Sequence, residues 1–186
     1  MAKMTFNCYT FPIPYPIVVV VAGWERPNPS TYIYFGEFNQ DPIIIGIGIR
    51  ERRYTYKLMK ETGEFTVNFV NRKILRDADL AGMVSGRNVD KTRLCRFTYV
   101  PSQKIRTPII EEAPVNLEVK IYDEIKFTDH NLILGKVENV LVSAEYVKEG
   151  KVDFKSIDYV VTDYNSISYY SVGPFIARWG FSKEEE

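Results

Sequence analysis

The stretch IIIGIGIRERRYTYKLMKETGEFTVNFV, residues 43–70, decides the fold that we expect. Residues 43–49 are β-branched apart from two glycines, a composition that is typical of a strand. A helix is predicted from about Arg53 to Glu61, because Gly63 is well suited to end it in a left-handed conformation. Residues 65–70 then predict another strand.

Further elements are predicted on both sides of this stretch. The β-branched run at residues 17–23 predicts a strand buried on both faces, and the prolines of residues 24–30 predict a turn after it. A second helix is expected over residues 73–84. The other predicted strands cover residues 31–35, 97–100, 115–127 and 131–146, the last two joined by a hairpin turn. Many strands with two inserted helices predict a mainly β fold, a closed barrel decorated by helices.

The composition indicates one globular domain. The chain has 186 residues without a repeat or a linker, so we expect a single domain over residues 1–186. Lysine and arginine together number 24, as do aspartate and glutamate, and this balance argues against a dedicated nucleic-acid-binding protein.

The longest apolar run, residues 17–22, is too short to span a membrane. Because no apolar leader follows Met1, we expect a cytoplasmic protein.

Few side chains of this sequence supply reactive chemistry. Cys8 and Cys95 are far apart and lack metal-ligand spacing, so neither a metal site nor a disulfide framework is expected. The single histidine, His130, falls in the predicted hairpin turn, and we interpret it as an exposed loop residue rather than a catalytic base. An enzyme with this composition would take its chemistry from a cofactor.

Two segments are candidates for binding an anion. Three arginines and Thr55 lie within residues 50–55, where a predicted strand gives way to a predicted helix. Helix starts offer free N–H groups, and arginine matches phosphate oxygens, so this segment suits a monophosphate. Residues 85–91 contain a serine, a glycine and two cations that would complete the site. The alternatives are a charged surface turn for the first segment and an ordinary helix end for the second.

These segments together resemble the flavin reductase–like, or flavoredoxin-like, family. The resemblance rests on Asn28-Pro29-Ser30-Thr31, on Asp41-Pro42 and above all on RYTYKLMKETGEFTVN, residues 53–68. It covers a core of about residues 12–147 and leaves residues 148–186 as a C-terminal extension. The resemblance implies a split β-barrel of Greek-key type with a few peripheral helices, which holds FMN near the interface of a homodimer.

The resemblance also implies which residues contact FMN. Along the isoalloxazine ring it places Ser30, Thr31, Tyr32 and Ile33. Beside the ring and the ribityl chain it places the backbone of Gly46, Ile47, Gly48 and Ile49, where the two glycines share one face of the strand and admit close approach. Positions at the phosphate are basic or hydroxylated: Arg53 and Thr55, with Arg50 or Arg52 assisting, and Ser85, Arg87 and Lys91. No residue is assigned a catalytic role.

The implied function is an FMN-dependent oxidoreductase. It would move electrons from NADH or NADPH through FMN to free flavin, ferric iron or a protein acceptor. One alternative is a module that binds FMN for electron transfer or sensing without turnover. Another is a structural protein whose aromatic C-terminal tail, residues 168–175, lies at a subunit interface.

Overall fold

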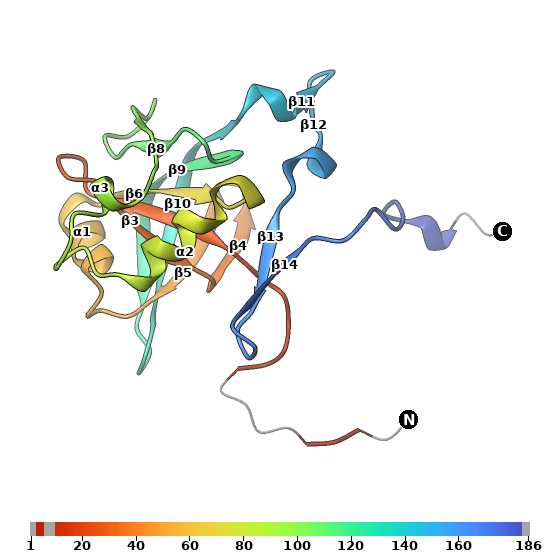
Figure 1. The fold of residues 1–186 in the computed structure, drawn as a ribbon, viewed down its shortest axis with the longest axis horizontal. Coiled ribbons are helices and arrows are strands. Elements are labelled where there is room, and N and C mark those ends of the chain that lie inside the picture. Colours follow the sequence, from red (N-terminus) through yellow and green to blue (C-terminus); the bar gives the residue numbers. More distant parts are fainter. Residues whose placement is uncertain (1–2, 6–9, 184–186) are drawn as a thin grey trace.

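The computed structural model describes residues 3–5 and 10–183, so Cys8 lies outside the described residues. Its main body is a seven-stranded antiparallel sheet in the order β3-β2-β6-β9-β10-β5-β4 (Figure 1). In chain order, its strands are β2 (Val18–Ala22), β3 (Asn28–Tyr32), β4 (Phe35–Gln40), β5 (Ile43–Ile49), β6 (Glu64–Phe69), β9 (Val115–Ile125) and β10 (Asn131–Val142).

Shorter elements surround this sheet. The α-helices are α1 (Tyr54–Thr62), α2 (Leu75–Met83) and α3 (Lys91–Leu94), and the 3₁₀ turns are η1 (Arg72–Ile74), η2 (Ala144–Tyr146), η3 (Phe154–Ile157) and η4 (Phe181–Lys183). A three-stranded sheet joins β1 (Tyr15–Pro16), β13 (Val160–Asp163) and β14 (Ser168–Ser171), and two strand pairs are β7 (Tyr99–Val100) with β8 (Ile109–Ile110) and β11 (Val147–Lys148) with β12 (Lys151–Val152). Within the described ranges, the helices are all too short or too polar to cross a membrane.

Strand β2 is buried on both faces, as its sequence predicts, because two apolar cores form on opposite sides of it. Val19 and Val21 face one core, which includes Ala78 of α2. Val18 and Val20 face the other core, which lies within the curve of the main sheet. Side chains alternate between the faces of a strand, so a run of valines serves both cores at once.

The main sheet curls so that its two ends approach each other. Val18 and Val20 of β2 share a core with Ile45 and Ile47 of β5, although three strands separate β2 from β5 in the sheet. The barrel is not closed, because β3 and β4 are the outermost strands of this sheet and do not pair with each other. The seam of the sheet therefore lies between its edge strands β3 and β4, where β3 also comes close to β5.

The predicted strand over residues 31–35 is wrong in its bounds. Strand β3 begins at Asn28 and ends at Tyr32, so it includes much of the predicted turn, and β4 begins at Phe35. Pro29 is tolerated because β3 is an edge strand, where the missing N–H group leaves no neighbouring strand unpaired. The prediction for residues 43–70 is confirmed: β5, α1 and β6 follow one another, and Gly63 ends α1 with φ 71°.

Candidate functional site

Two adjoining cavities lie at the seam of the barrel. The larger cavity, about 230 Å³, lies between the end of β3, the end of β5, the end of α2 and the β13–β14 hairpin. The smaller cavity, about 190 Å³, lies between β3, the start of α1 and the loop that follows α2. Ser30 and Arg53 line both cavities, so the two are neighbours.

The smaller cavity is cationic. Its described lining contains three basic side chains, Arg52, Arg53 and Lys91, and no carboxylate. The rest of the lining is mainly polar and includes the hydroxyl groups of Ser30 and Thr55. Cations without a matching carboxylate indicate a site for an anion.

Lys91 is the buried cation of this cavity. Its Nζ donates hydrogen bonds to the carbonyl oxygens of Pro29 at 2.9 Å and Ala81 at 2.6 Å. The residue is only 3% exposed. Burial lowers the pKa of Lys91 to about 8, and the nearby Arg53 adds to this shift. An anion in the cavity would offset both effects, because an opposite charge favours the ammonium form.

The start of α1 also faces the smaller cavity. Arg53 occupies the N-cap position, and no side chain caps the first N–H groups of the helix. Tyr54 and Thr55, the first two helical residues, line the cavity. The Thr55 hydroxyl accepts a hydrogen bond from Asn28 at 3.0 Å, which leaves its own proton available for a ligand. Free N–H groups at a helix start favour negative charge.

Tyr32, which lines the larger cavity, has a hydroxyl group without a hydrogen-bond partner in the described part of the chain. Its oxygen is buried. Burial raises the pKa of this phenol, and the neighbouring Thr55, Ser30 and Arg53 oppose the shift in part. A buried hydroxyl without a partner costs free energy, so a ligand acceptor at this place would stabilise the protein.

Gly86 explains how the loop after α2 reaches this close to β3. A Cβ atom at Gly86 would lie 1.9 Å from Oδ1 of Asn28 and 2.9 Å from the Tyr54 ring. The loop thus rests directly on two residues of the smaller cavity, and only glycine fits there. Its role differs from the helix-ending role that the sequence suggests, because the cap of α2 is Val84 in extended conformation.

The larger cavity has mainly aromatic and aliphatic walls. Tyr34, Tyr164 and Tyr169 line it together with Met83 and Ile167. Tyr164 and Ile167 come from the turn between β13 and β14, and Tyr169 comes from β14, so this hairpin closes one side of the cavity. The Tyr169 hydroxyl donates a hydrogen bond to Asp79 of α2 at 2.6 Å, and this bond ties the hairpin to the helix.

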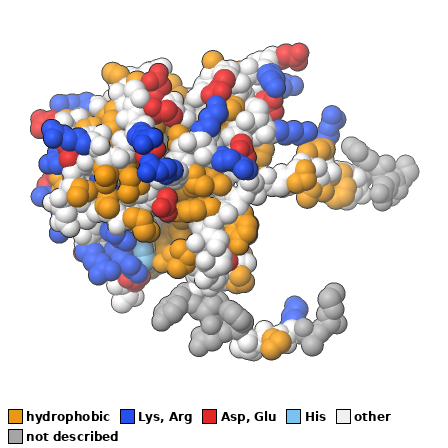
Figure 2. All heavy atoms as spheres, in the orientation of Figure 1, with side chains coloured by type: hydrophobic (Ala, Val, Ile, Leu, Met, Phe, Trp, Pro, Cys, Tyr) orange, Lys and Arg blue, Asp and Glu red, His pale blue; other side chains and the backbone are white. Residues whose placement is uncertain are grey.

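An arginine–aspartate–histidine chain lies at the other side of the larger cavity. Arg50 donates two hydrogen bonds of 2.8 Å to Asp129, and Nδ1 of His130 lies 2.8 Å from the same carboxylate. The Arg50 guanidinium lowers the pKa of Asp129, and burial together with Arg50 lowers the pKa of His130. The His130 ring is edge-on to Tyr34, with centroids 5.1 Å apart. Figure 2 shows the histidine beside a group of basic side chains.

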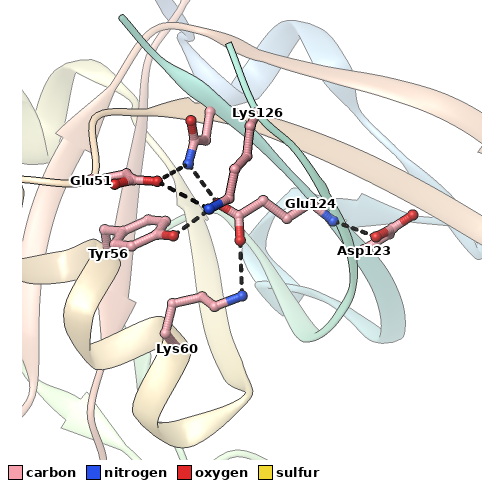
Figure 3. Close-up of polar contacts among 7 residues, drawn as sticks. Glu51, Tyr56, Lys60, Asp123, Glu124 and Lys126 are labelled. Carbon is pink, nitrogen blue, oxygen red and sulfur yellow. Dashed lines mark hydrogen bonds and ion pairs between the residues drawn. The ribbon is translucent and has the colours of Figure 1, made fainter. Parts of the chain in front are cut away.

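A second network fixes the start of α1 against the β9–β10 hairpin (Figure 3). Glu124 accepts hydrogen bonds from Tyr56 and Lys60 of α1, each at 2.8 Å, and from Asn131 of β10 at 2.6 Å. Although burial opposes the shift, these bonds hold the pKa of Glu124 below its ordinary value. Asn131 also donates to Glu51. The arginine-rich turn before α1 is therefore fixed at its start, through Arg50 and Glu51, and at its end, through the first residues of α1.

The structure brings most of the predicted site residues together. Those that line the larger cavity are Ser30, Thr31, Tyr32, Ile33, Gly48, Ile49, Arg50 and Arg53. Those that line the smaller cavity are Ser30, Arg53, Thr55, Ser85 and Lys91. Arg50 does not line the smaller cavity, because Asp129 holds its guanidinium elsewhere; the arginines that line it are Arg52 and Arg53.

Three predicted residues lie outside both cavities. Ile47 is fully buried in the core, and Arg87 is exposed on the loop after α2. Gly46 shares a face with Gly48, as predicted, but Phe38 and Leu132 cover it: an added Cβ would lie 2.5 Å and 2.8 Å from their atoms. The glycine face of β5 is thus partly filled by side chains of the protein itself.

Sequence reasoning missed several lining residues. Asn28 was assigned to a turn, and His130, read as an exposed loop residue, lines the larger cavity with a side chain that is 29% exposed. Tyr164 and Tyr169 were missed because they lie in the extension after residue 147. Nothing in the local sequence shows that this hairpin folds back over α2; its tyrosines were the only signal.

Comparison with known proteins identifies the family. The model of the flavin reductase like domain matches residues 10–161. An uncharacterised protein of Archaeoglobus fulgidus is 32% identical over 153 residues, 82% of this chain and 86% of that protein. Flavoredoxin of Desulfovibrio vulgaris (Miyazaki F) matches 98% of this chain and 100% of its own, with a TM-score of 0.91 and 29% identity.

A solved structure also bears on the barrel. A putative flavin reductase with a split barrel domain from Shewanella frigidimarina matches 89% of this chain and 85% of its own, with a TM-score of 0.79 and 20% identity. The mainly β split-barrel fold predicted from the sequence is thereby confirmed. With the family model spanning most of the chain, this protein belongs to the flavin reductase like domain family.

Proposed function

We propose that this chain binds FMN across the two cavities and works as an oxidoreductase that moves electrons from NADH or NADPH to free flavin, ferric iron or a protein acceptor. The observation that carries the proposal is the buried ammonium of Lys91, which faces the smaller cavity with Arg53 and the uncapped start of α1. Membership of the flavin reductase like domain family and the similarity to flavoredoxin support a flavin as the ligand.

The residues around the cavities fit FMN at both of its ends. At the phosphate end, Arg53, Lys91 and the Thr55 hydroxyl are donors, and no carboxylate is among the described residues that line the cavity. Charge-assisted hydrogen bonds from such groups suit a phosphate dianion. At the larger cavity, the free hydroxyl of Tyr32 would donate to a polar group of the ligand.

The larger cavity suits the flat ring of a flavin. Tyrosines and aliphatic side chains form its walls, together with Gly48 and Ile49 at the end of β5. Aromatic walls favour an aromatic ligand through stacked or edge contacts. A Cβ at Gly48 would lie 2.8 Å from Cβ of Tyr34, so a glycine at this position allows Tyr34 to pack directly on β5.

Bound FMN would supply the redox chemistry, because a flavin accepts and releases electrons in one-electron or two-electron steps. The protein's own residues would bind the phosphate, orient the ring and limit the access of water. His130 lines the larger cavity, and Asp129 beside it would keep the imidazole in a fixed hydrogen-bond pattern next to the ligand. No side chain is assigned as an acid or a base.

We also propose that the protein works as a homodimer in the cytoplasm. Large aromatic side chains stay exposed on the isolated chain, among them Phe38, Phe127 and Tyr122, each more than 60% exposed. Monomeric proteins rarely expose such groups together, and subunit interfaces are rich in them.

The experiment that tests FMN binding is an absorption spectrum of the purified protein, followed by titration of the flavin-free protein with FMN. The expected result is a flavin spectrum and a rise in melting temperature with FMN, since a ligand of the native state stabilises it. Colourless protein that gains no stability from excess FMN would refute the proposal.

Turnover separates an oxidoreductase from a module that only holds FMN. The oxidation of NADH and of NADPH is followed with free flavin or a ferric chelate as acceptor. The proposal expects multiple turnovers with at least one donor. Tight FMN binding with bleaching by neither donor would support the electron-transfer or sensor module instead.

A further inference from the structure

The last described segment of the chain is an arm that is separate from the body. Residues 172–183 form this C-terminal arm, which leaves β14 and runs away from the main sheet (Figure 1). Its described ties to the body are near its start: Val172 donates to the Tyr159 carbonyl, and Lys155 lies 4.5 Å from the centre of the Phe175 ring. In the part of the arm that the structure describes after Phe175, no hydrogen bond or ion pair reaches the body.

The C-terminal arm is apolar despite its exposure. Trp179 is fully exposed, Ile176 is 93% exposed, and Phe175 and Phe181 are each more than half exposed. Figure 2 shows these hydrophobic side chains as a group that stands clear of the body. Exposed apolar groups on this scale mark a surface that another molecule covers.

The body offers an apolar groove of matching character. This groove, about 310 Å³, lies on β4 and β5 and is lined mainly by aromatic residues and glycines, including Phe38, Gly46 and Phe127. Phe38 is 62% and Phe127 is 63% exposed. Strand β4 is the last strand of the main sheet, so its outer edge has no partner strand among the described elements. Such edges are normally covered.

The groove borders the flavin cavity. Tyr34, Gly48 and His130 line both the groove and the larger cavity. A segment that lies in the groove would therefore contact residues that also line the proposed flavin site.

We propose that the C-terminal arm of one copy of this chain lies in the apolar groove of a second copy, and reciprocally. The inference rests on the proposed homodimer and names the surfaces that form it. The same two patches occur on every copy, which is what a two-fold interface requires. The four apolar side chains of the arm expose on the order of 500 Å². Together with a groove, this approaches the roughly 800 Å² per partner of a stable interface.

Trp179 provides a direct test in the full chain. The chain has two tryptophans, so Trp24→Phe leaves Trp179 as the only one. Its emission and the mass by sedimentation are measured together over a range of protein concentrations. The expected result is a dimer with the blue-shifted emission of a buried indole, which shifts to the red at the same dilution that halves the mass.

Paired substitutions locate the contact. Ile176→Ser in the arm and Phe38→Ser in the groove should each weaken dimerisation at least about tenfold. The double variant should weaken dimerisation by less than the product of the two single fold-changes, because the two side chains belong to the same contact. Val152→Ser, a half-exposed residue of β12, is the matched control and should change nothing. Circular dichroism checks that each variant is folded.

Other outcomes overturn the inference in distinguishable ways. A dimer whose Trp179 emission is that of an exposed indole leaves the homodimer standing and removes the arm from its interface. A blue-shifted emission that does not depend on concentration, in a monomer, means that the arm folds onto its own chain. A dimer that Ile176→Ser weakens and Phe38→Ser does not places the arm elsewhere on the partner. A monomer with an exposed indole contradicts both proposals, while FMN binding is measured separately.

Discussion

Lys91 keeps an ammonium group where water is nearly excluded, held by two main-chain oxygens and repelled by Arg53. The two carbonyl groups stabilise the charge only in part, because its pKa is still lowered to about 8. A buried lysine without a carboxylate partner is costly to the free protein. We infer that the ligand supplies the missing negative charge.

The pH dependence of FMN binding should report the titration of Lys91. Below pH 8 the free protein carries the ammonium, and above pH 8 it loses the proton. A bound phosphate dianion raises this pKa, so FMN binds the protonated form better, and the dissociation constant should rise as the pH increases above about 8. Calorimetric titration between pH 6.5 and 9.5 measures it.

Lys91→Met is the matched variant for this profile. It should weaken FMN binding by roughly 10- to 150-fold at pH 7, the equivalent of about 1.5–3 kcal/mol for a charge-assisted contact. In the Lys91→Met variant, the dissociation constant for FMN should no longer rise above pH 8. Riboflavin, which lacks the phosphate, should bind the variant and the original protein equally. An unchanged pH profile in Lys91→Met would assign the titration to another group.

Arg53 and Arg87 form a second matched pair at the residue scale. The sequence places both at the phosphate, but the structure places only Arg53 in the cavities. Arg53→Ala should therefore weaken FMN binding by about 1.5–3 kcal/mol, while Arg87→Ala should leave it within about 0.5 kcal/mol. Fluorescence titration with FMN measures both. Equal losses in the two variants would contradict the position of the smaller cavity.

At the scale of elements, the site depends on two segments that lie against β3 and α2. The loop after α2 rests on Asn28 through Gly86, and the β13–β14 hairpin is tied to α2 through Tyr169 and Asp79. These contacts join parts of the chain that are distant in sequence, so each contact is a place where one small change should alter a cavity.

Gly86→Ala should damage the smaller cavity. The added methyl group meets Oδ1 of Asn28 at 1.9 Å, so Asn28 or the loop must move. Overpacking of this kind destabilises a protein by about 1–3 kcal/mol, and FMN binding should weaken as well. Urea unfolding measures the loss. Gly173→Ala is the control, because nothing lies within 4 Å of its added methyl group; an equal effect of the two changes would exclude a steric cause.

Tyr169→Phe should loosen the β13–β14 hairpin without unfolding the body. It removes the hydrogen bond to Asp79, which is worth about 1 kcal/mol or less at a partly exposed place. Burial, with Asp79 in support, raises the pKa of Tyr169 to about 12, so the phenol stays protonated at neutral pH. Hydrogen exchange of residues 160–171 should speed up. Tyr170→Phe should change the exchange much less, since the hydrogen bond described for the Tyr170 hydroxyl is a long, exposed one of 3.5 Å to Ser166.

At the scale of the whole molecule, the sequence predicts the body of the fold better than its seam. Periodicity and Gly63 suffice for β5, α1 and β6, because those elements follow from local composition. The predicted bounds of the strand at residues 31–35 were wrong because a proline such as Pro29 is acceptable only in an edge strand. Which strand is at the edge depends on the order of strands in the complete sheet.

The candidate site was predicted where one segment carries its chemistry. The arginine-rich turn and Lys91 were found because cations near a helix start point to an anion. Arg50 and Gly46 were misplaced because their partners come from other parts of the chain: Asp129 from the loop between β9 and β10, and Phe38 from β4. The C-terminal hairpin was missed because no local pattern specifies which face of the body it covers.

The phosphate contribution to flavin affinity tests the central claim most directly. FMN and riboflavin are titrated into the flavin-free protein at pH 7 by calorimetry. Two charge-assisted contacts of about 1.5 kcal/mol each predict that FMN binds at least about 100-fold more tightly than riboflavin. Equal affinities for the two flavins would contradict an anion site at Arg53 and Lys91.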